Sequence, residues 1–131
     1  MDFEEAIRQL CQKDKRYMPQ AYQLVRLSLD LAQKNVHGEI KKNKVQPNRH
    51  VTGPQLLEGF RQHVLETYGP MSYTLLHSWG IKKSVDVGHI VFNIIETGMF
   101  GRSDEDRLED FENVYDFKDA FLRPFEPNLK A

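Results

Sequence analysis

Cysteine is nearly absent from this 131-residue sequence, in which Cys11 is the single example. One cysteine excludes an internal disulfide and a cysteine-based zinc cluster. Long hydrophobic runs are absent too, and none approaches the roughly 18 to 20 apolar residues that span a bilayer. Acidic residues follow Met1 at once, where a secretory signal needs a basic stretch and then an apolar one. These absences predict a cytoplasmic protein with a reduced thiol and without a membrane span.

The sequence also lacks the motifs of the common enzyme classes. It has no Gly-x-Ser-x-Gly nucleophile turn, no glycine-rich phosphate loop and no dinucleotide-binding fingerprint. A lone cysteine in a helical pattern, as at Cys11, is typically a small apolar filler. No two histidines have the His-x-x-x-His spacing, and the single His63 and Glu66 pair reverses the Glu-x-x-His order of di-metal bundles. We therefore expect no catalytic residue, no metal ligand and no cofactor.

An excess of charge of one sign is likewise missing, because 18 lysines and arginines face 19 aspartates and glutamates. The balance hides a gradient, with a net charge of +4 over residues 1–50, −1 over 51–100 and −4 over 101–131. Such asymmetry is typical of a basic binding face opposite an acidic one, although two solvated ends that attract each other give the same pattern. With 40% hydrophobic and 11% aromatic residues the chain can bury a core, which excludes a fully disordered protein.

Helix signals begin close to the N-terminus. Phe3, Ile7 and Leu10 recur at helical spacing behind Asp2, which can cap the first helix. Tyr17-Met18-Pro19 ends that helix, and the proline fits the first turn of the next one. A broad apolar stripe then predicts a second helix as far as about residue 35.

Three further helices are predicted in the middle of the chain. They cover residues 52–68, 71–79 and 84–98. Thr52 and Gln55 form a capping box at the start of the first of them, and Gly69 ends it. Ser84 or Asp86 is expected to cap the last one, whose apolar residues recur at helical spacing.

Aromatic residues crowd the C-terminal segment, which follows an acidic stretch suited to a helix start. They are Phe111, Tyr115, Phe117, Phe121 and Phe125. Leaving five rings in water is unfavourable at about 25 cal/mol per Å², so we expect most of them to dock on the helical core. One or two of them could instead form a partner-binding patch. The β propensity of residues 112–117 also allows a short hairpin.

Together these patterns predict a mainly α protein, a single compact domain over residues 1–131 with five to six helices. Its expected parts are a helical hairpin (2–36), a basic loop (37–51), a three-helix unit (52–100) and an acidic, aromatic C-terminal segment (101–131). The three-helix unit resembles a helix-turn-helix, with Trp79-Gly80-Ile81 as its turn. The buried position at Val87 comes one residue later than that motif usually has it.

The last helix of that unit is poorly suited to reading DNA. No lysine or arginine occurs from Ser84 to Gly101, whereas a helix in the major groove needs donors for bases and positive charge for phosphates. A basic set elsewhere is a better candidate for binding a nucleic-acid backbone, although a merely solvated loop has the same composition. This set is Lys41, Lys42, Lys44, Arg49 and His50, joined by Lys13, Lys15 and Arg16 if the first two helices pack as a hairpin.

Several short phrases of the sequence form a recognisable order. They are Tyr17…Ala21-Tyr22…Val25, Arg49-His50-Val51-Thr52-Gly53, Leu56-Leu57-Glu58-Gly59, Tyr68-Gly69-Pro70-Met71, Trp79-Gly80-Ile81, Ile90-Val91-Phe92-Asn93, Tyr115-Asp116-Phe117, Ala120-Phe121 and Pro124-Phe125. Over nearly the whole chain, this order resembles the uncharacterised signature-protein family of the Planctomycetes–Verrucomicrobia–Chlamydiae bacterial superphylum. The resemblance implies a cytoplasmic bacterial protein with a housekeeping role, for which nucleic-acid association has been suggested. It brings no catalytic residues with it.

Within those phrases, some polar residues are not needed for caps, turns or core. They are Arg49, His50, Glu58, Asn93, Asp116 and Arg123, and a site is expected among them. The leading hypothesis is a non-enzymatic binding module that contacts the RNA or DNA backbone within a larger cytoplasmic assembly. A protein–protein adaptor that uses the acidic, aromatic C-terminal segment is the alternative, and a small enzyme with an unrecognised site is the third.

Overall fold

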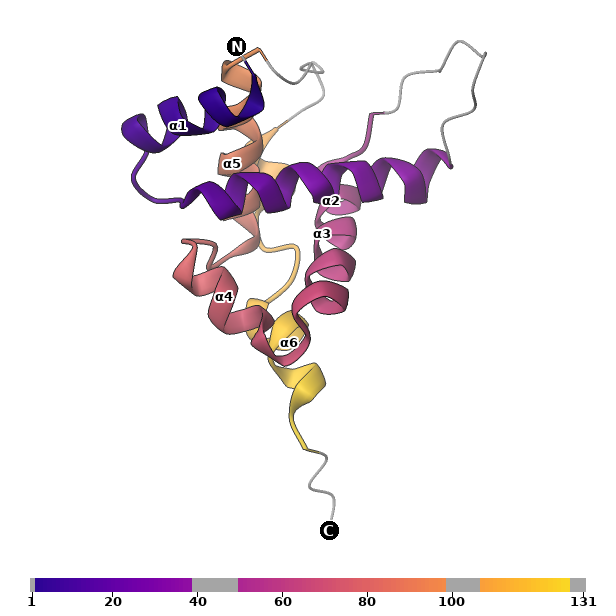
Figure 1. The fold of residues 1–131 in the computed structure, drawn as a ribbon. Coiled ribbons are helices and arrows are strands. Elements are labelled where there is room, and N and C mark those ends of the chain that lie inside the picture. The colour runs from indigo at the N-terminus through magenta and orange to yellow at the C-terminus, as the bar shows by residue number, and fades with distance from the viewer. Residues whose placement is uncertain (1, 39–49, 99–106, 128–131) are drawn as a thin grey trace.

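The computed structural model describes residues 2–38, 50–98 and 107–127, and it is mainly helical over these ranges (Figure 1). The α-helices are α1 (Phe3–Lys13), α2 (Pro19–His37), α3 (Gly53–Tyr68), α4 (Ser72–Ser78), α5 (Ser84–Glu96) and α6 (Phe117–Phe121). Single 3-10 turns are η1 (Gly69–Met71), η2 (Leu108–Phe111) and η3 (Arg123–Phe125). The predicted mainly helical fold is confirmed.

Most predicted helix ends are where the capping chemistry puts them. The Asp2 carboxylate accepts the Glu5 N–H at 2.8 Å ahead of α1, and Pro19 opens α2. The capping box before α3 is formed, because the Thr52 hydroxyl accepts the Gln55 N–H at 3.2 Å and the Gln55 side chain accepts the Thr52 N–H at 2.9 Å. These contacts satisfy backbone donors that an isolated helix end leaves free.

At the start of α5, the two residues predicted as alternative caps, Ser84 and Asp86, both make contacts, but different ones from those expected. Asp86 lies inside the first turn, and its carboxylate accepts the backbone N–H of both Lys82 and Lys83, at 2.9 and 3.0 Å. Ser84 is not a cap, because its hydroxyl donates to the Phe111 carbonyl at 2.6 Å and so ties α5 to η2. The carboxylate caps the helix from within, where it also meets the positive end of the helix dipole.

The core forms where α2 crosses α3 and α5, with α1 on one side of it and α4 and α6 together at the far end (Figure 1). Tyr22, Phe60 and Ile90 are fully buried there, one from each of the three central helices. Gly59 lets α2 and α3 approach closely, since a Cβ at that position would lie 2.9 Å from the Ala32 Cβ. The predicted apolar stripes therefore face one another.

The C-terminal aromatics mostly dock on this core, as predicted. Phe111, Phe117 and Phe121 are buried, and Tyr115 is half-buried with its hydroxyl donating to the Leu57 carbonyl at 2.8 Å. Phe125 is the exception at 41% exposed. Ring burial thus gives the acidic segment a firm attachment to α3 and α5.

The hairpin suggested for residues 112–117 is wrong, since the structure has no strand in the ranges that it describes. Asn113 adopts a positive φ of 52°, which breaks an extended run, and the Asp116 carboxylate accepts the Asp119 N–H at 3.1 Å to start α6. Docking of Phe117 on Phe60, with ring centroids 6.5 Å apart, outweighs the local β propensity.

Helices α3, α4 and α5 follow one another in the order that the helix-turn-helix prediction requires, and Ile81 and Val87 are fully buried. The helix-turn-helix likeness of these helices stays a prediction. Among the helices of the described ranges, none is long and apolar enough to cross a membrane.

Candidate functional site: a polar junction between two helix turns

Two turns that are far apart in the sequence pack against each other at one end of α2. The Met18 N–H, at the α1–α2 turn, donates to the Trp79 carbonyl at 3.1 Å, at the α4–α5 turn. Gly80 has a φ of +96°, and a Cβ there would overlap the Arg16 carbonyl oxygen. Only glycine combines that φ with so close an approach, so the sequence fixes how tightly the turns can meet.

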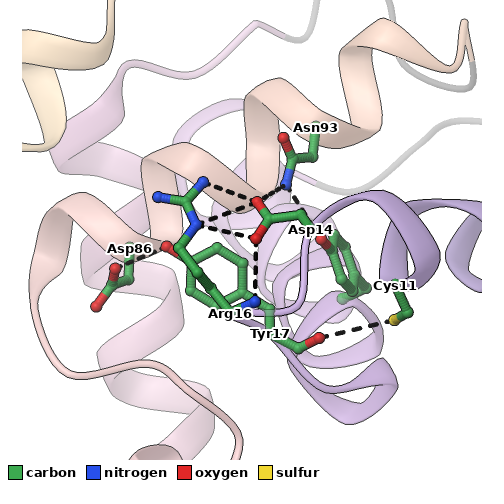
Figure 2. Close-up of polar contacts among 7 residues, drawn as sticks. Cys11, Asp14, Arg16, Tyr17, Asp86 and Asn93 are labelled. Atoms are coloured by element: carbon green, nitrogen blue, oxygen red, sulfur yellow. Dashed lines mark hydrogen bonds and ion pairs between the residues drawn. The ribbon is translucent and has the colours of Figure 1, made fainter.

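Asp14 is the centre of a polar cluster on this junction (Figure 2). The Arg16 guanidinium donates to both carboxylate oxygens, with its shortest contact at 2.7 Å, and the Arg16 backbone N–H donates to Oδ1 at 3.0 Å. From α5, the Asn93 amide donates to Asp14 Oδ2 at 3.0 Å and to the Tyr22 hydroxyl oxygen at 3.1 Å. The Asp14 carboxylate therefore links the α1–α2 turn to α5, and the Asn93 amide extends the link to Tyr22 of α2.

A second carboxylate, Asp86, joins the other half of the junction. The Tyr17 hydroxyl donates to Asp86 Oδ1 at 2.7 Å (Figure 2). Asp86 Oδ2 accepts the backbone N–H groups of Lys82 and Lys83. The Tyr17 ring is buried and lies 5.1 Å from the Arg16 guanidinium carbon, in cation–π range. Asp86 and the Met18–Trp79 hydrogen bond therefore both connect the α1–α2 turn to the α4–α5 turn.

The pKa shifts in this cluster indicate that its side chains stabilise the fold and do not transfer protons at neutral pH. The hydrogen bond from the Arg16 side chain holds the pKa of Asp14 well below its usual range, against the opposing effect of burial. Burial, assisted by the Asp86 carboxylate, raises the pKa of Tyr17. Burial also raises the pKa of the Cys11 thiol, which donates to the Tyr17 carbonyl at 3.7 Å and is therefore held as a weak nucleophile.

Asp14→Asn is expected to lower the free energy of unfolding by about 1 kcal/mol at pH 7, because it removes a charge-assisted pair. A depressed native pKa stabilises the fold above the unfolded pKa of about 4 and loses that effect as the pH falls through the native pKa. The deficit of the variant relative to the parent should therefore be constant above about pH 5 and shrink below pH 4. Urea denaturation between pH 7 and pH 3 measures it.

Asp30→Asn is the matched control for that series. Asp30 pairs with Arg26 at 3.9 Å on the surface of α2, and its side chain is 63% exposed. Such a pair contributes at most a few tenths of a kcal/mol, so this variant should differ little from the parent at any pH. An Asp14→Asn deficit that is as small as the control's, or that grows on acidification, would contradict the stabilising role of the Asp14 cluster.

The junction also gathers positive charge. Lys13, Lys15 and Arg16 on the α1–α2 turn are exposed, as are Lys82 and Lys83 on the α4–α5 turn. The two carboxylates among these cations are already engaged, Asp14 by Arg16 and Asn93, and Asp86 by Tyr17 and two backbone N–H groups. These five cations are called the basic junction below. Three of them, Lys13, Lys15 and Arg16, were predicted as candidates from the sequence.

His50 is not part of the basic junction. It lies near the opposite end of α2, where its carbonyl oxygen contacts the His37 Nε2 at 2.6 Å, and a 19-residue helix is roughly 28 Å long. The expected proximity of His50 to Arg16 is therefore wrong, because the α1–α2 turn and the end of α2 are separated by the whole helix (Figure 1). Lys41, Lys42, Lys44 and Arg49 lie outside the described residues.

The remaining polar candidates are accounted for mainly by local contacts. Glu58 accepts two hydrogen bonds from Arg61 one turn later in α3, at 2.6 and 3.0 Å, and this pairing lowers its pKa. Arg123 pairs with Asp119 at 2.8 Å on the surface. Asp116 caps α6. Of this group, Asn93 alone joins a long-range cluster, through Asp14 and Tyr22.

Sequence reasoning missed Asp14 and the pairing of Tyr17 with Asp86. Asp14 and Asn93 are 79 positions apart, and no spacing rule connects them. The one available signal was the Asp14-x-Arg16 pattern just before a helix, in which a carboxylate can accept the N–H two residues on. For metal binding, the described ranges bring no three His, Cys, Asp or Glu side chains together in a ligand-like group.

No family model, curated protein or solved structure was found to match this chain.

Proposed function

We propose that this protein is a non-enzymatic module that binds the phosphate backbone of RNA or DNA through the basic junction. The observation that carries the proposal is the convergence of two basic turns, held together by Asp86 and the Met18–Trp79 hydrogen bond. A rigid platform of several exposed cations suits repeated phosphates, because each phosphate contact releases counterions.

Two features of the junction support a nucleic-acid backbone over a single small anion. The four lysines carry no ion pair with any described residue, so their charges are available. They also come from two separate turns and therefore span a surface instead of surrounding one point. The α5 helix itself has no cation, which favours sequence-blind binding over base reading in a groove.

The resemblance to the bacterial signature-protein family points in the same direction and remains a prediction. So does a contribution from Lys41, Lys42, Lys44 and Arg49, which would add a second basic segment. The adaptor alternative loses part of its motivation, because Phe111, Phe117 and Phe121 belong to the core and are not available to a partner.

The test is nucleic-acid binding as a function of salt. Changing Lys13, Lys15, Lys82 and Lys83 to glutamine should weaken binding of a short RNA or DNA. It should also lower the slope of log K against log salt, by about 0.9 for each duplex phosphate that the variant no longer neutralises. Fluorescence anisotropy from about 50 to 200 mM salt measures both quantities.

The matched control removes four exposed cations elsewhere, Arg26, Lys34, Arg107 and Lys118, with the same change in net charge. It should leave most of the salt slope intact. A third variant that changes Lys41, Lys42, Lys44 and Arg49 measures the other basic segment separately. Absence of binding at about 50 mM salt, or equal losses in the junction and control variants, would overturn the proposal.

A further inference from the structure

A groove of about 600 Å³ adjoins the basic junction, between the start of α5 and the segment that joins η2 to α6. It is lined by Lys82, Lys83, Ser84, Val85, Glu112, Asn113, Tyr115, Asp116 and Phe117. A volume of this size is within the range of about 300 to 1,000 Å³ typical of sites for small organic ligands. None of the five histidines contributes to the lining.

The walls of the groove are held in place by contacts that do not use its polar rim. The Ser84 hydroxyl donates to the Phe111 carbonyl at 2.6 Å and accepts the Val114 N–H at 3.3 Å, which fixes the two walls to each other. Tyr115 is anchored through its hydroxyl on the Leu57 carbonyl, and Phe117 is buried. Gly88 keeps η2 close to α5, because a Cβ there would lie 2.7 Å from the Phe111 ring.

The rim, in contrast, has free polar groups of both signs. Lys82 and Lys83, just before α5, and Glu112 and Asn113, in the segment between η2 and α6, all belong to the lining. All four residues are exposed, and their side chains form no ion pair or hydrogen bond within the described ranges. Asp116, whose Oδ1 is engaged as the cap of α6, adds a second carboxylate to the lining.

This charge distribution selects the chemistry of the ligand. A purely anionic ligand would meet the carboxylates of Glu112 and Asp116, and a purely cationic one would meet the two lysines. A ligand that is anionic at one end and a hydrogen-bond donor at the other satisfies both sides. A nucleotide has this form, with a phosphate and, in three of the common bases, an exocyclic amine.

We propose that the groove binds a single nucleotide, with its phosphate at Lys82 and Lys83 and the amino-bearing edge of its base at Glu112 and Asn113. The proposal deepens the nucleic-acid function and rests on it, since the same two lysines belong to the basic junction. Guanine ranks first, because its ring N–H and exocyclic amine are adjacent donors that match the two oxygens of one carboxylate. Uracil lacks the amine and ranks last.

The test titrates the intact chain with guanosine, cytidine and uridine monophosphates and with inorganic phosphate, followed by NMR shifts and calorimetry. The guanosine nucleotide should bind at least about fivefold more tightly than the uridine nucleotide, the lower end of what one good base contact discriminates. Inorganic phosphate should bind most weakly, because it contacts the lysines alone.

Two variants assign the contacts. Glu112→Gln should reduce the preference for guanosine over uridine to less than about twofold. Binding of inorganic phosphate should not weaken, because the variant keeps both lysines and removes a nearby negative charge. Glu109→Gln is the matched control, since Glu109 is an exposed carboxylate of η2 that is not in the lining. Equal affinities for the guanosine and uridine nucleotides, or a preference unaffected by Glu112→Gln, would overturn the groove proposal.

A competition experiment separates this failure from failure of the proposed function. A guanine-containing single strand bound to the protein should be displaced in part by the free guanosine nucleotide, and the Glu112→Gln variant should lose that effect. If the strand still binds with the salt slope due to Lys13 and Lys15 but no mononucleotide competes, the groove proposal alone is wrong. If the strand does not bind either, both proposals are wrong.

Discussion

Gly80→Ala is expected to lower the free energy of unfolding by about 3 kcal/mol or more. A φ of +96° strains any residue with a Cβ by roughly 1 to 3 kcal/mol. In addition, the new methyl group would overlap the Arg16 carbonyl oxygen, a backbone atom that cannot move without displacing the α1–α2 turn. The turns would have to separate and give up the Met18–Trp79 and Tyr17–Asp86 hydrogen bonds, each contributing about 1 kcal/mol.

Gly98→Ala provides the control for the backbone strain alone. Gly98 has a similar φ of +82°, but an added Cβ there meets no atom of the described residues within 4 Å. Its cost should be close to about 1 kcal/mol, so the difference between the two variants reports the close approach of the turns. Urea denaturation of both variants at neutral pH gives the two free energies. Equal losses at Gly80 and Gly98 would show that the turns do not meet as described.

The Gly80 variant also probes the proposed function. Because the junction cations come from both turns, separating the turns should weaken nucleic-acid binding even though no charge is removed. Gly98→Ala should leave binding unchanged.

Phe121→Ala is expected to cost about 3 to 5 kcal/mol, the range for removing a buried phenyl ring. The Phe121 side chain is fully buried, and its ring lies 5.9 Å from Phe60, 5.9 Å from Tyr115 and 4.9 Å from Phe117, centroid to centroid, each in an edge-to-face arrangement. Truncation would leave a cavity at the place where α6 attaches to α3. Thermal and urea denaturation of the variant measure the loss.

Phe125→Ala is the control from the same segment, since Phe125 is 41% exposed. It should cost less than about 1 kcal/mol. If Phe121→Ala lowers the free energy of unfolding as little as the control does, the C-terminal aromatics would again be candidates for a partner-binding patch. The expected large loss would leave the acidic side chains of this segment as the part still available to an adaptor function.

The helices could be predicted because their signals are local. The Asp2 cap, the Thr52 and Gln55 capping box and the Pro19 start depend on side chains within three residues of the backbone groups they satisfy. Where the prediction was wrong, at residues 112–117, a long-range contact overrode local propensity. Docking of Phe117 on Phe60 and the left-handed Asn113 turned a strand-like sequence into a bend before α6.

The candidate site was predicted only in part because its contacts are not local. Arg16 and Asn93 were each singled out, one as a cation and one as an unexplained polar residue, but their common partner Asp14 was not. Lys82 and Lys83 gain importance only when the α4–α5 turn packs on the α1–α2 turn. Conversely, Glu58 pairs with Arg61 and Arg123 pairs with Asp119, each within about one helical turn. Such short-range pairs are common among exposed helix charges and indicate no site.

The helical class, most helix ends, the core residues and the charge gradient could be read from the amino-acid sequence alone, because each follows from hydrophobic periodicity, capping chemistry or composition. Which charges are neighbours depends on the three-dimensional packing of the helices. This packing united Lys13, Lys15 and Arg16 with Lys82 and Lys83, placed His50 at the far end of α2, and formed a groove between lysines and carboxylates from different segments. Electrostatic interactions depend on distance in space, and that distance is fixed by packing, here by the approach of two turns that Gly80 permits.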